Sequence, residues 1–233
     1  MLEELKRQVL EANLELPSAG LVRLTWGNVS GRDPGSGLVV IKPSGVPYSR
    51  LSTDLMVVVG PSGEVVEGQA RPSTDTPTHL VLYRDLPEVG GIVHTHSTWA
   101  TAWAQARRPV PLLGTTHADF SPLPVEVTEE LTPEEVEAGY EVATGEAILR
   151  TLGGRPPLEI PAVLVGGHGP FCWGVSAAAA VEAAVTLEQV AKMAWLSSVL
   201  EQAASPLPEH IVQRHFSRKH GPDAYYGQKA VPR

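Results

Sequence analysis

Two histidines close the apolar segment Gly90-Gly-Ile-Val-His94-Thr-His96-Ser97. The segment predicts a short buried strand, and because side chains alternate along a strand, His94 and His96 would lie on the same face. Two neighbouring imidazoles on a rigid element are typical ligands of a metal ion. The alternative is a pair of buried histidines that are hydrogen-bonded and hold no metal.

A third histidine would complete a catalytic metal site and still leave one coordination position open. His168 is the candidate, because the flanking glycines of Gly166-Gly-His168-Gly let the backbone approach closely. Otherwise it is a turn histidine in solvent. Asp75 is a candidate fourth ligand or a partner of a ligand, and it could equally cap the helix that follows it. Imidazoles with or without one carboxylate favour Zn²⁺, then Mn²⁺ or Co²⁺.

Small polar residues beside glycine recur in Trp26-Gly-Asn28-Val-Ser30 and Lys42-Pro-Ser44-Gly45-Val46. Each segment is predicted to follow a strand, so that backbone N–H groups and side-chain donors could converge on a phosphate. Ser73 and Thr74 add two hydroxyls. Each motif alone is ordinary turn chemistry. Together, and with Lys42 among them, they favour an anionic small substrate.

The candidate acid and base groups are Asp119, in a segment predicted to be a loop (114–123), and the tyrosines of the C-terminal tail. Their ordinary roles would be a solvated carboxylate and a packing contact. Chain ends usually fray unless they are tied down, so Phe216, Tyr225 and Tyr226 indicate that the tail docks on a surface such as a neighbouring subunit.

These residues need elements to position them, and the periodicity of apolar residues predicts both helices and strands. The helices are expected at 2–16, 77–84, 99–107, 132–149 and 176–203, followed by a short helix before the tail. The strands are expected at 21–24, 38–41, 55–59, 64–67, 90–96 and 162–165. Because they do not follow a strict βαβ rhythm, we expect an α/β fold with a mostly antiparallel or mixed sheet and helices on its faces.

Composition excludes several classes of protein. A chain of 233 residues suits one domain, 1–233, and a net charge of -8 with no long basic run argues against nucleic-acid or anionic-membrane binding. Cys172 is the only cysteine, so no intrachain disulfide forms. The first residues lack the features of a signal peptide, so we expect a cytoplasmic protein. Neither a dinucleotide-binding glycine motif nor a Walker loop is present, so we expect no nucleotide cofactor.

Seven motifs, in order along the chain, resemble those of the class II aldolase/adducin family and in particular its sugar-phosphate epimerases. The resemblance runs from just after the first helix to the last ten residues. The motifs are Trp26-Gly-Asn-Val-Ser30, Lys42-Pro-Ser-Gly-Val46, Arg71-Pro-Ser-Thr-Asp-Thr-Pro-Thr-His79, Val93-His-Thr-His-Ser97, Thr116-His-Ala-Asp119, His168-Gly-Pro-Phe171 and Lys219-His-Gly with Tyr-Tyr-Gly-Gln228.

The resemblance implies a class II aldolase/adducin-like fold, with helices on both faces of the sheet, and a role for each matching residue. Zn²⁺ would be bound by Asp75, His94, His96 and His168. The substrate and its phosphate would be bound by Asn28, Lys42, Ser44, Gly45, Ser73 and Thr74. Asp119 and Tyr226 would be the acid/base pair, with Tyr226 supplied by the adjacent subunit of a cyclic homotetramer, and His215 and Arg218 would lie near that intersubunit site. Ser-Thr replaces the Ser-Ser that often precedes Asp75 in the family, which keeps a hydroxyl.

The reaction that the resemblance implies is inversion of C4 of L-ribulose 5-phosphate to give D-xylulose 5-phosphate. The C3–C4 bond would break in a retro-aldol step and re-form on the other face, through an enediolate held by the metal. The alternatives are an aldolase acting on a ketose 1-phosphate, in which Glu is typical at the position of Asp75, and epimerisation of L-xylulose 5-phosphate. A third is a non-catalytic adducin-like interaction domain, which should have lost metal ligands.

Overall fold

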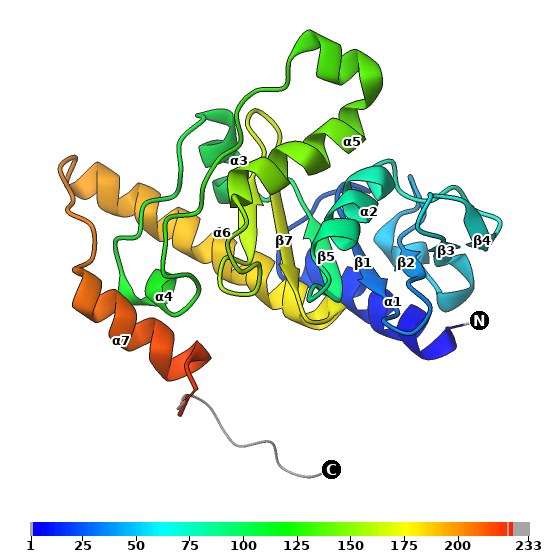
Figure 1. The fold of residues 1–233 in the computed structure, drawn as a ribbon, viewed down its shortest axis with the longest axis horizontal. Helices are drawn as coiled ribbons and strands as arrows, with labels where there is room; N and C mark the ends of the chain where they lie inside the picture. Colours follow the sequence, from blue (N-terminus) through cyan, green and yellow to red (C-terminus); the bar gives the residue numbers. More distant parts are fainter. Residues whose placement is uncertain (1, 223, 226–233) are drawn as a thin grey trace.

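The computed structural model describes residues 2–222, 224 and 225 and contains one seven-stranded sheet (Figure 1). The strands are β1 (Asn28–Arg32), β2 (Val39–Ile41), β3 (Val57–Val59), β4 (Val65–Glu67), β5 (Gly91–His94), β6 (Ala162–Leu164) and β7 (Pro170–Gly174). Their order is β4-β3-β2-β1-β5-β7-β6, and all neighbouring strands are antiparallel. The predicted antiparallel sheet is confirmed.

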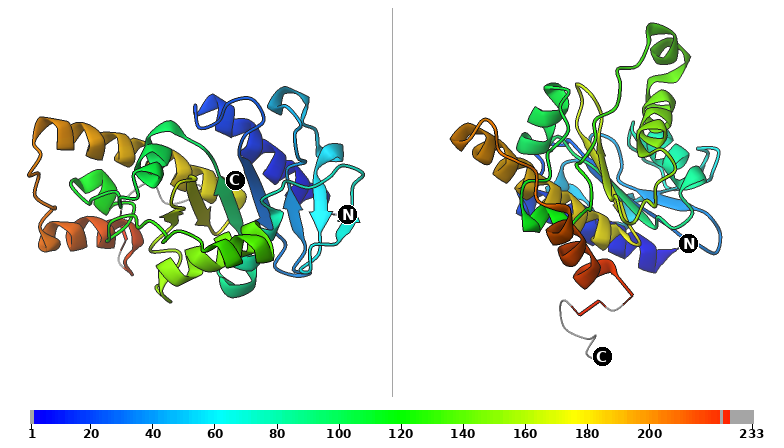
Figure 2. Two further views of the ribbon diagram at one scale, coloured as in Figure 1. Left: turned by 90° about the horizontal axis from the view of Figure 1, so that it is seen from above. Right: turned by 60° about the vertical axis from the view of Figure 1, so that its left-hand side comes forward.

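Helices cover both faces of this sheet, as the family resemblance implied. They are α1 (Glu3–Ser18), α2 (Thr76–Asp85), α3 (Thr98–Gln105), α4 (Thr115–Ala118), α5 (Pro133–Leu152), α6 (Ala177–Leu200) and α7 (Glu209–His220). Figure 2 shows α1 and α6 on one side of the strands and α2 and α5 on the other. The sheet is therefore the middle layer of three.

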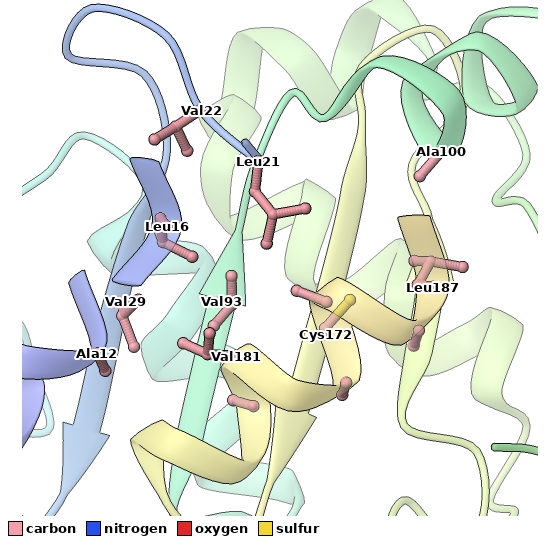
Figure 3. Packing of buried hydrophobic residues seen from close by; sticks show 14 of the residues in the cluster. Ala12, Leu16, Leu21, Val22, Val29, Val93, Ala100, Cys172, Val181 and Leu187 are labelled. Atoms are coloured by element: carbon pink, nitrogen blue, oxygen red, sulfur yellow. The ribbon is translucent and has the colours of Figure 1, made fainter. Parts of the chain in front are cut away.

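Alternation along the strands divides the core into two clusters. Val40, Val93 and Cys172 face α1, α3 and α6, and Figure 3 shows Val93 and Cys172 packed beside residues of these helices. Their sequence neighbours Ile92 and Phe171 point the other way, toward α2 and α5. Since both faces are buried, a slip of one residue in any central strand would exchange the two cores.

The sequence predicts one strand near the site wrongly, at 21–24 instead of β1, and gives no indication of another, β7. Residues 21–24 form no strand, and Leu24 has a φ of 53°, in the left-handed region that a strand excludes. The strand β1 instead begins at Asn28. Its sequence is mostly polar, and pairing with β2 on one side and β5 on the other holds it in the sheet. β7 follows the glycine-rich turn of His168 directly and pairs with β5 and β6.

Several boundaries also differ from the expected ones. α1 continues through Pro17 to Ser18, and α6 ends at Leu200 rather than near 203. The segment expected to be a loop contains the single-turn helix α4. α5 has the predicted capping box at Thr132 but bends at Gly139, whose φ of 150° is not helical.

Candidate active site

His94 is fixed at the end of β5 by its neighbours in the sheet. It pairs with Asn28 of β1 on one side and with Phe171 of β7 on the other, and its ring stacks on Phe171 with centroids 4.3 Å apart. His94 Nδ1 donates to the carbonyl of Pro170 at 3.0 Å. This bond places the ring proton on Nδ1 and leaves a lone pair on Nε2.

The Nε2 atoms of three histidines converge. His96 Nε2 lies 3.1 Å from both His94 Nε2 and His168 Nε2, and the three candidate ligand atoms lie within 4.8 Å of one another. β5 itself ends at His94, so His96 reaches this position from the first residues after the strand rather than from within it. The predicted meeting of the three histidines is confirmed.

This cluster suits a metal ion. Tetrahedral zinc with bonds of about 2.0–2.1 Å to nitrogen separates its ligands by about 3.3–3.4 Å, close to the 3.1 Å between His96 Nε2 and each of the other two Nε2 atoms. Burial lowers the pKa of His94 to about 3 and lowers the pKa of His96 and His168 as well. Neutral imidazoles keep the lone pairs that coordination requires.

The backbone of the β6–β7 turn holds His168 in place. Gly166 N donates to Thr128 Oγ1 at 3.0 Å, and Gly167 N donates to the carbonyl of Ala104 at 2.9 Å. A Cβ on Gly169 would lie 2.7 Å from the carbonyl oxygen of Thr95, so no larger residue fits there without a backbone shift. Glycine is therefore required for the turn to approach the segment 94–96 that carries the other two histidines.

Asp75 occupies the N-cap position of α2 but does not cap it. Its carboxylate makes no capping hydrogen bond, and Oδ2 instead accepts a bond of 2.6 Å from Asn28 Nδ2. Burial acts to raise the pKa of Asp75, but the nearby imidazoles of His94 and His79 and the Asn28 amide outweigh it, so the pKa is lowered. The capping alternative is wrong, and an ionised carboxylate lies beside the histidines.

One pocket brings most of the predicted site residues together. Its lining includes the three histidines and Asp75, and the predicted substrate residues Asn28, Lys42, Ser44, Gly45, Ser73 and Thr74. Trp26 also lines it, with its ring centroid 6.3 Å from that of His96. The sequence motif contained Trp26, but nothing in its spacing distinguished it from a core aromatic.

Lys42 is the cation of this pocket. Its side chain is almost fully buried, and among the described residues Nζ donates to the carbonyls of Thr25 and Pro43, at 3.4 and 3.3 Å, and lies 5.0 Å from the ring centroid of Tyr48. Burial lowers the pKa of Lys42, and the charge of Asp75 opposes this shift. Tyr48, a residue that sequence reasoning missed, also donates to the carbonyls of Trp26 and Gly27.

Asp119 lies in a different pocket, lined also by Lys219 and His220. Its Oδ1 accepts bonds from Arg218 Nε at 3.0 Å and His215 Nδ1 at 3.1 Å, and its Oδ2 accepts one from Arg218 at 2.6 Å. Burial acts to raise the pKa of Asp119, but Arg218 and His215 lower it overall. The three predicted residues therefore meet one another but not the histidine cluster of the same chain. Tyr226 lies outside the described residues.

The described part of the chain contains no helix long and apolar enough to span a membrane.

Comparisons with known proteins agree with this architecture. The family profile described as "Class II Aldolase and Adducin N-terminal domain" matches residues 7–195. The protein named "L-ribulose-5-phosphate 4-epimerase UlaF" from Salmonella paratyphi B (strain ATCC BAA-1250 / SPB7) is 54% identical over 228 residues, which cover 98% of this chain and 100% of that protein. The protein of the same name from Salmonella choleraesuis (strain SC-B67) matches equally.

Solved structures show the same fold. A structure described as "L-fuculose 1-phosphate aldolase" has a TM-score of 0.78 at 26% identity, over 92% of this chain and 95% of that one. The L-fuculose-1-phosphate aldolase of Thermus thermophilus has a TM-score of 0.67 at 26% identity, over 88% and 100%. With the profile match, the full-length relatives and the shared fold in agreement, this chain belongs to the class II aldolase/adducin family.

Proposed function

We propose that this chain inverts C4 of L-ribulose 5-phosphate to give D-xylulose 5-phosphate. The observation that carries the proposal is the single pocket in which three neutral imidazoles lie beside Lys42 and the polar groups of residues 44–45 and 73–74. A ketose phosphate needs both halves of such a pocket, one for its oxygens and one for its phosphate. The 54% identity to proteins named as this epimerase favours epimerisation.

His94, His96 and His168, with Asp75 beside them, would hold a divalent metal, and Zn²⁺ is the first choice for this donor set. When bound, the metal would supply a Lewis acid that stabilises negative charge developing next to the C2 ketone. Asn28 fixes the orientation of the Asp75 carboxylate through the bond from Nδ2. Without this bond the carboxylate could rotate away from the histidines.

The phosphate end of the pocket has a second role in an epimerase. The C4–H bond is not acidic, so inversion proceeds by retro-aldol cleavage of C3–C4, and the aldehyde fragment carries the phosphate. Lys42 and the donors of Ser44, Gly45, Ser73 and Thr74 would retain this fragment while its carbonyl turns to present the other face. Retention separates an epimerase from an aldolase, which releases both products.

Proton transfer to and from the C4 oxygen requires a group on each side of the aldehyde. We assign these roles to Asp119 and Tyr226 of an adjacent subunit, in a cyclic homotetramer. The pocket of Asp119 is separate from the histidine pocket of its own chain, which supports a site shared between subunits. His215 and Arg218 keep Asp119 ionised and oriented.

An NMR time course with purified protein tests this proposal. L-ribulose 5-phosphate, L-xylulose 5-phosphate and L-fuculose 1-phosphate are supplied separately. We expect the first to be converted to D-xylulose 5-phosphate without release of free aldehyde. Cleavage of L-fuculose 1-phosphate with no epimerisation would show an aldolase instead, the second candidate that the structural similarity to the two aldolases favours. Faster conversion of L-xylulose 5-phosphate would correct the substrate.

A further inference from the structure

The phenol of Tyr140 contacts the one histidine of the cluster that a turn carries. Tyr140 Oη lies 3.0 Å from His168 Nδ1, and the two ring centroids are 6.1 Å apart. Tyr140 comes from α5, none of whose residues lines the pocket itself. The contact thus connects the cluster to a helix on the outside of the sheet.

The tautomer of His168 determines the direction of this bond. His168 directs Nε2 toward His96, so the Nε2 lone pair is the one available to a metal. The ring proton must then be on Nδ1, and Nδ1–H donates to Tyr140 Oη. His94 has the same arrangement, since its Nδ1 donates to the carbonyl of Pro170. A second bond of this kind fixes the ring of a metal-binding histidine and makes it more basic.

The bend in α5 brings the phenol to this position. Gly139 has φ 150° and ψ 97°, a conformation that residues with a side chain rarely adopt, and Figure 1 shows α5 changing direction. A Cβ on Gly139 would meet nothing within 4 Å, so the requirement for glycine is conformational and not steric.

Hydrogen bonds from α2 and from α5 itself hold the backbone immediately after the bend. Thr78 of α2 donates its hydroxyl to the carbonyl of Glu141 at 2.7 Å, and Thr144 donates to the carbonyl of Tyr140 at 2.8 Å. Gly145 packs so closely on α2 that a Cβ there would lie 2.7 Å from the side chain of Val81. α2 also begins directly after Asp75, so one helix anchors both the carboxylate and the phenol.

We propose that Tyr140 is a positioning residue of the metal centre, which accepts the Nδ1–H of His168 and aims its Nε2 at the ion shared with His94 and His96. This inference rests on the part of the proposed function in which the three histidines bind a metal. It does not depend on the substrate.

Metal binding by Tyr140→Phe tests the inference, because this variant keeps the ring and removes only the hydroxyl. Tyr140 is 38% exposed, so water can partly replace the phenol, and we expect Co²⁺ to bind about 10-fold more weakly, at the lower end of the usual loss for such partners. The affinity is measured by competition with a chromogenic chelator. The visible spectrum of bound Co²⁺ should also shift, while the melting temperature of the metal-free protein stays unchanged.

Thr151→Val is the matched control, because Thr151 lies on the same helix and its hydroxyl donates to the carbonyl of Ala147, away from the histidines. It should bind Co²⁺ as the wild type does. Gly139→Ala is a second variant, which keeps the phenol but strains the bend, and it should also weaken binding. Wild-type affinity and an unchanged spectrum in both Tyr140→Phe and Gly139→Ala would overturn the inference.

His168→Ala separates failure of this inference from failure of the metal centre. If His168→Ala weakens Co²⁺ binding and Tyr140→Phe does not, only the positioning role is wrong. If His168→Ala binds Co²⁺ as tightly as the wild type, His168 is not a ligand, and the metal centre of the proposed function fails with it.

Discussion

Lys42 is the residue whose surroundings are hardest to explain without a bound anion. The residue is 2% exposed, and its ammonium has no carboxylate within ion-pair distance in the described part of the chain. An unpaired buried charge is costly, and the lowered pKa of Lys42 reflects that cost. A phosphate in the pocket would supply the missing partner. Pairing with Lys42 would therefore contribute to the binding free energy of the substrate.

Replacing Lys42 by Met should therefore weaken substrate binding specifically. A hydrogen bond to a charged group contributes about 1.5–3 kcal/mol, so we expect KM to rise roughly 10- to 100-fold. Zinc content should not change, because Lys42 is not part of the histidine cluster. Steady-state kinetics and metal analysis provide the two measurements. Lys192→Met, at an exposed position of α6, should keep the wild-type KM, and an unchanged KM in Lys42→Met would remove its proposed role.

The three histidines proposed to bind the metal were easier to predict than the residues that orient them. His94 and His96 share a short sequence motif, and glycines mark His168, so residue type and spacing were sufficient. Tyr140 and Tyr48 have no such signal. Their contacts depend on a helix bend and on the folding of distant loops, which no local pattern encodes.

At the scale of elements, α6 stabilises the start of α3, the helix that follows His96. The carboxylate of Glu188 accepts bonds from the backbone N–H groups of Trp99 at 2.9 Å and Ala100 at 3.0 Å, and Ser97 makes no capping bond of its own. A negative charge at this end of a helix is also favoured by the helix dipole. The helix that follows His96 is thus anchored by a neighbouring helix on the same face of the sheet.

Glu188→Ala should destabilise the metal-free protein. The variant leaves the buried N–H of Ala100 and the partly buried N–H of Trp99 without their partner, and we expect the free energy of unfolding to fall by about 1–3 kcal/mol. Urea denaturation measures it. Glu182→Ala on the exposed side of α6 is the control and should change the free energy by less than about 0.5 kcal/mol. Equal effects of the two variants would show that the cap contributes nothing.

The sequence predicted the elements that carry strong apolar patterns and failed where tertiary pairing decides. Asn28–Arg32 contains three polar residues and one glycine in five, and only its position between β2 and β5 makes it a strand. Residues 21–24 have a composition more typical of a strand, yet the left-handed backbone conformation of Leu24 excludes a strand there. Pairing with neighbouring strands therefore overrides the local preference of the sequence for or against a strand at the edge of the site.

For the whole molecule, buried histidines predict a loss of stability in mild acid. Burial lowers the pKa of His79 and His117 to about 4 and that of His94 to about 3. Below the unfolded value of about 6.5 the unfolded chain binds protons that the folded chain excludes. The stabilisation is therefore complete above that pH and declines as the pH falls.

Urea unfolding of the metal-free protein between pH 7.5 and 5 measures this dependence. Each histidine contributes about 1.4 kcal/mol per pH unit, so the three together predict a slope near 4 kcal/mol per unit below about pH 6. His79→Gln should reduce the slope by about a third. His210→Gln, on the exposed surface of α7, should leave it unchanged, and a flat profile in the wild type would contradict the assignment.

The separation of the two pockets makes the assembly itself part of the proposed chemistry. α4, which Asp119 directly follows, and α7, which carries its partners His215 and Arg218, lie at the opposite end of the molecule from β1 and β2 in Figure 1. Two complementary variants test this arrangement. A chain with His96→Ala lacks one proposed metal ligand but keeps Asp119, whereas a chain with Asp119→Asn keeps the three histidines but lacks the carboxylate. If sites are shared between subunits, neither variant is active alone, but neighbours in a mixed ring can form an intact site.

In a ring assembled at random from equal amounts of the two variants, about a quarter of the sites pair an intact cluster with an intact Asp119. We therefore expect mixed oligomers, made by co-expression and verified by native mass spectrometry, to regain up to about a quarter of wild-type turnover. Mixtures of separately assembled variants that do not exchange subunits should stay inactive. If mixed rings are also inactive, Asp119 does not act across the subunit boundary, and its assignment to the site of an adjacent subunit is wrong.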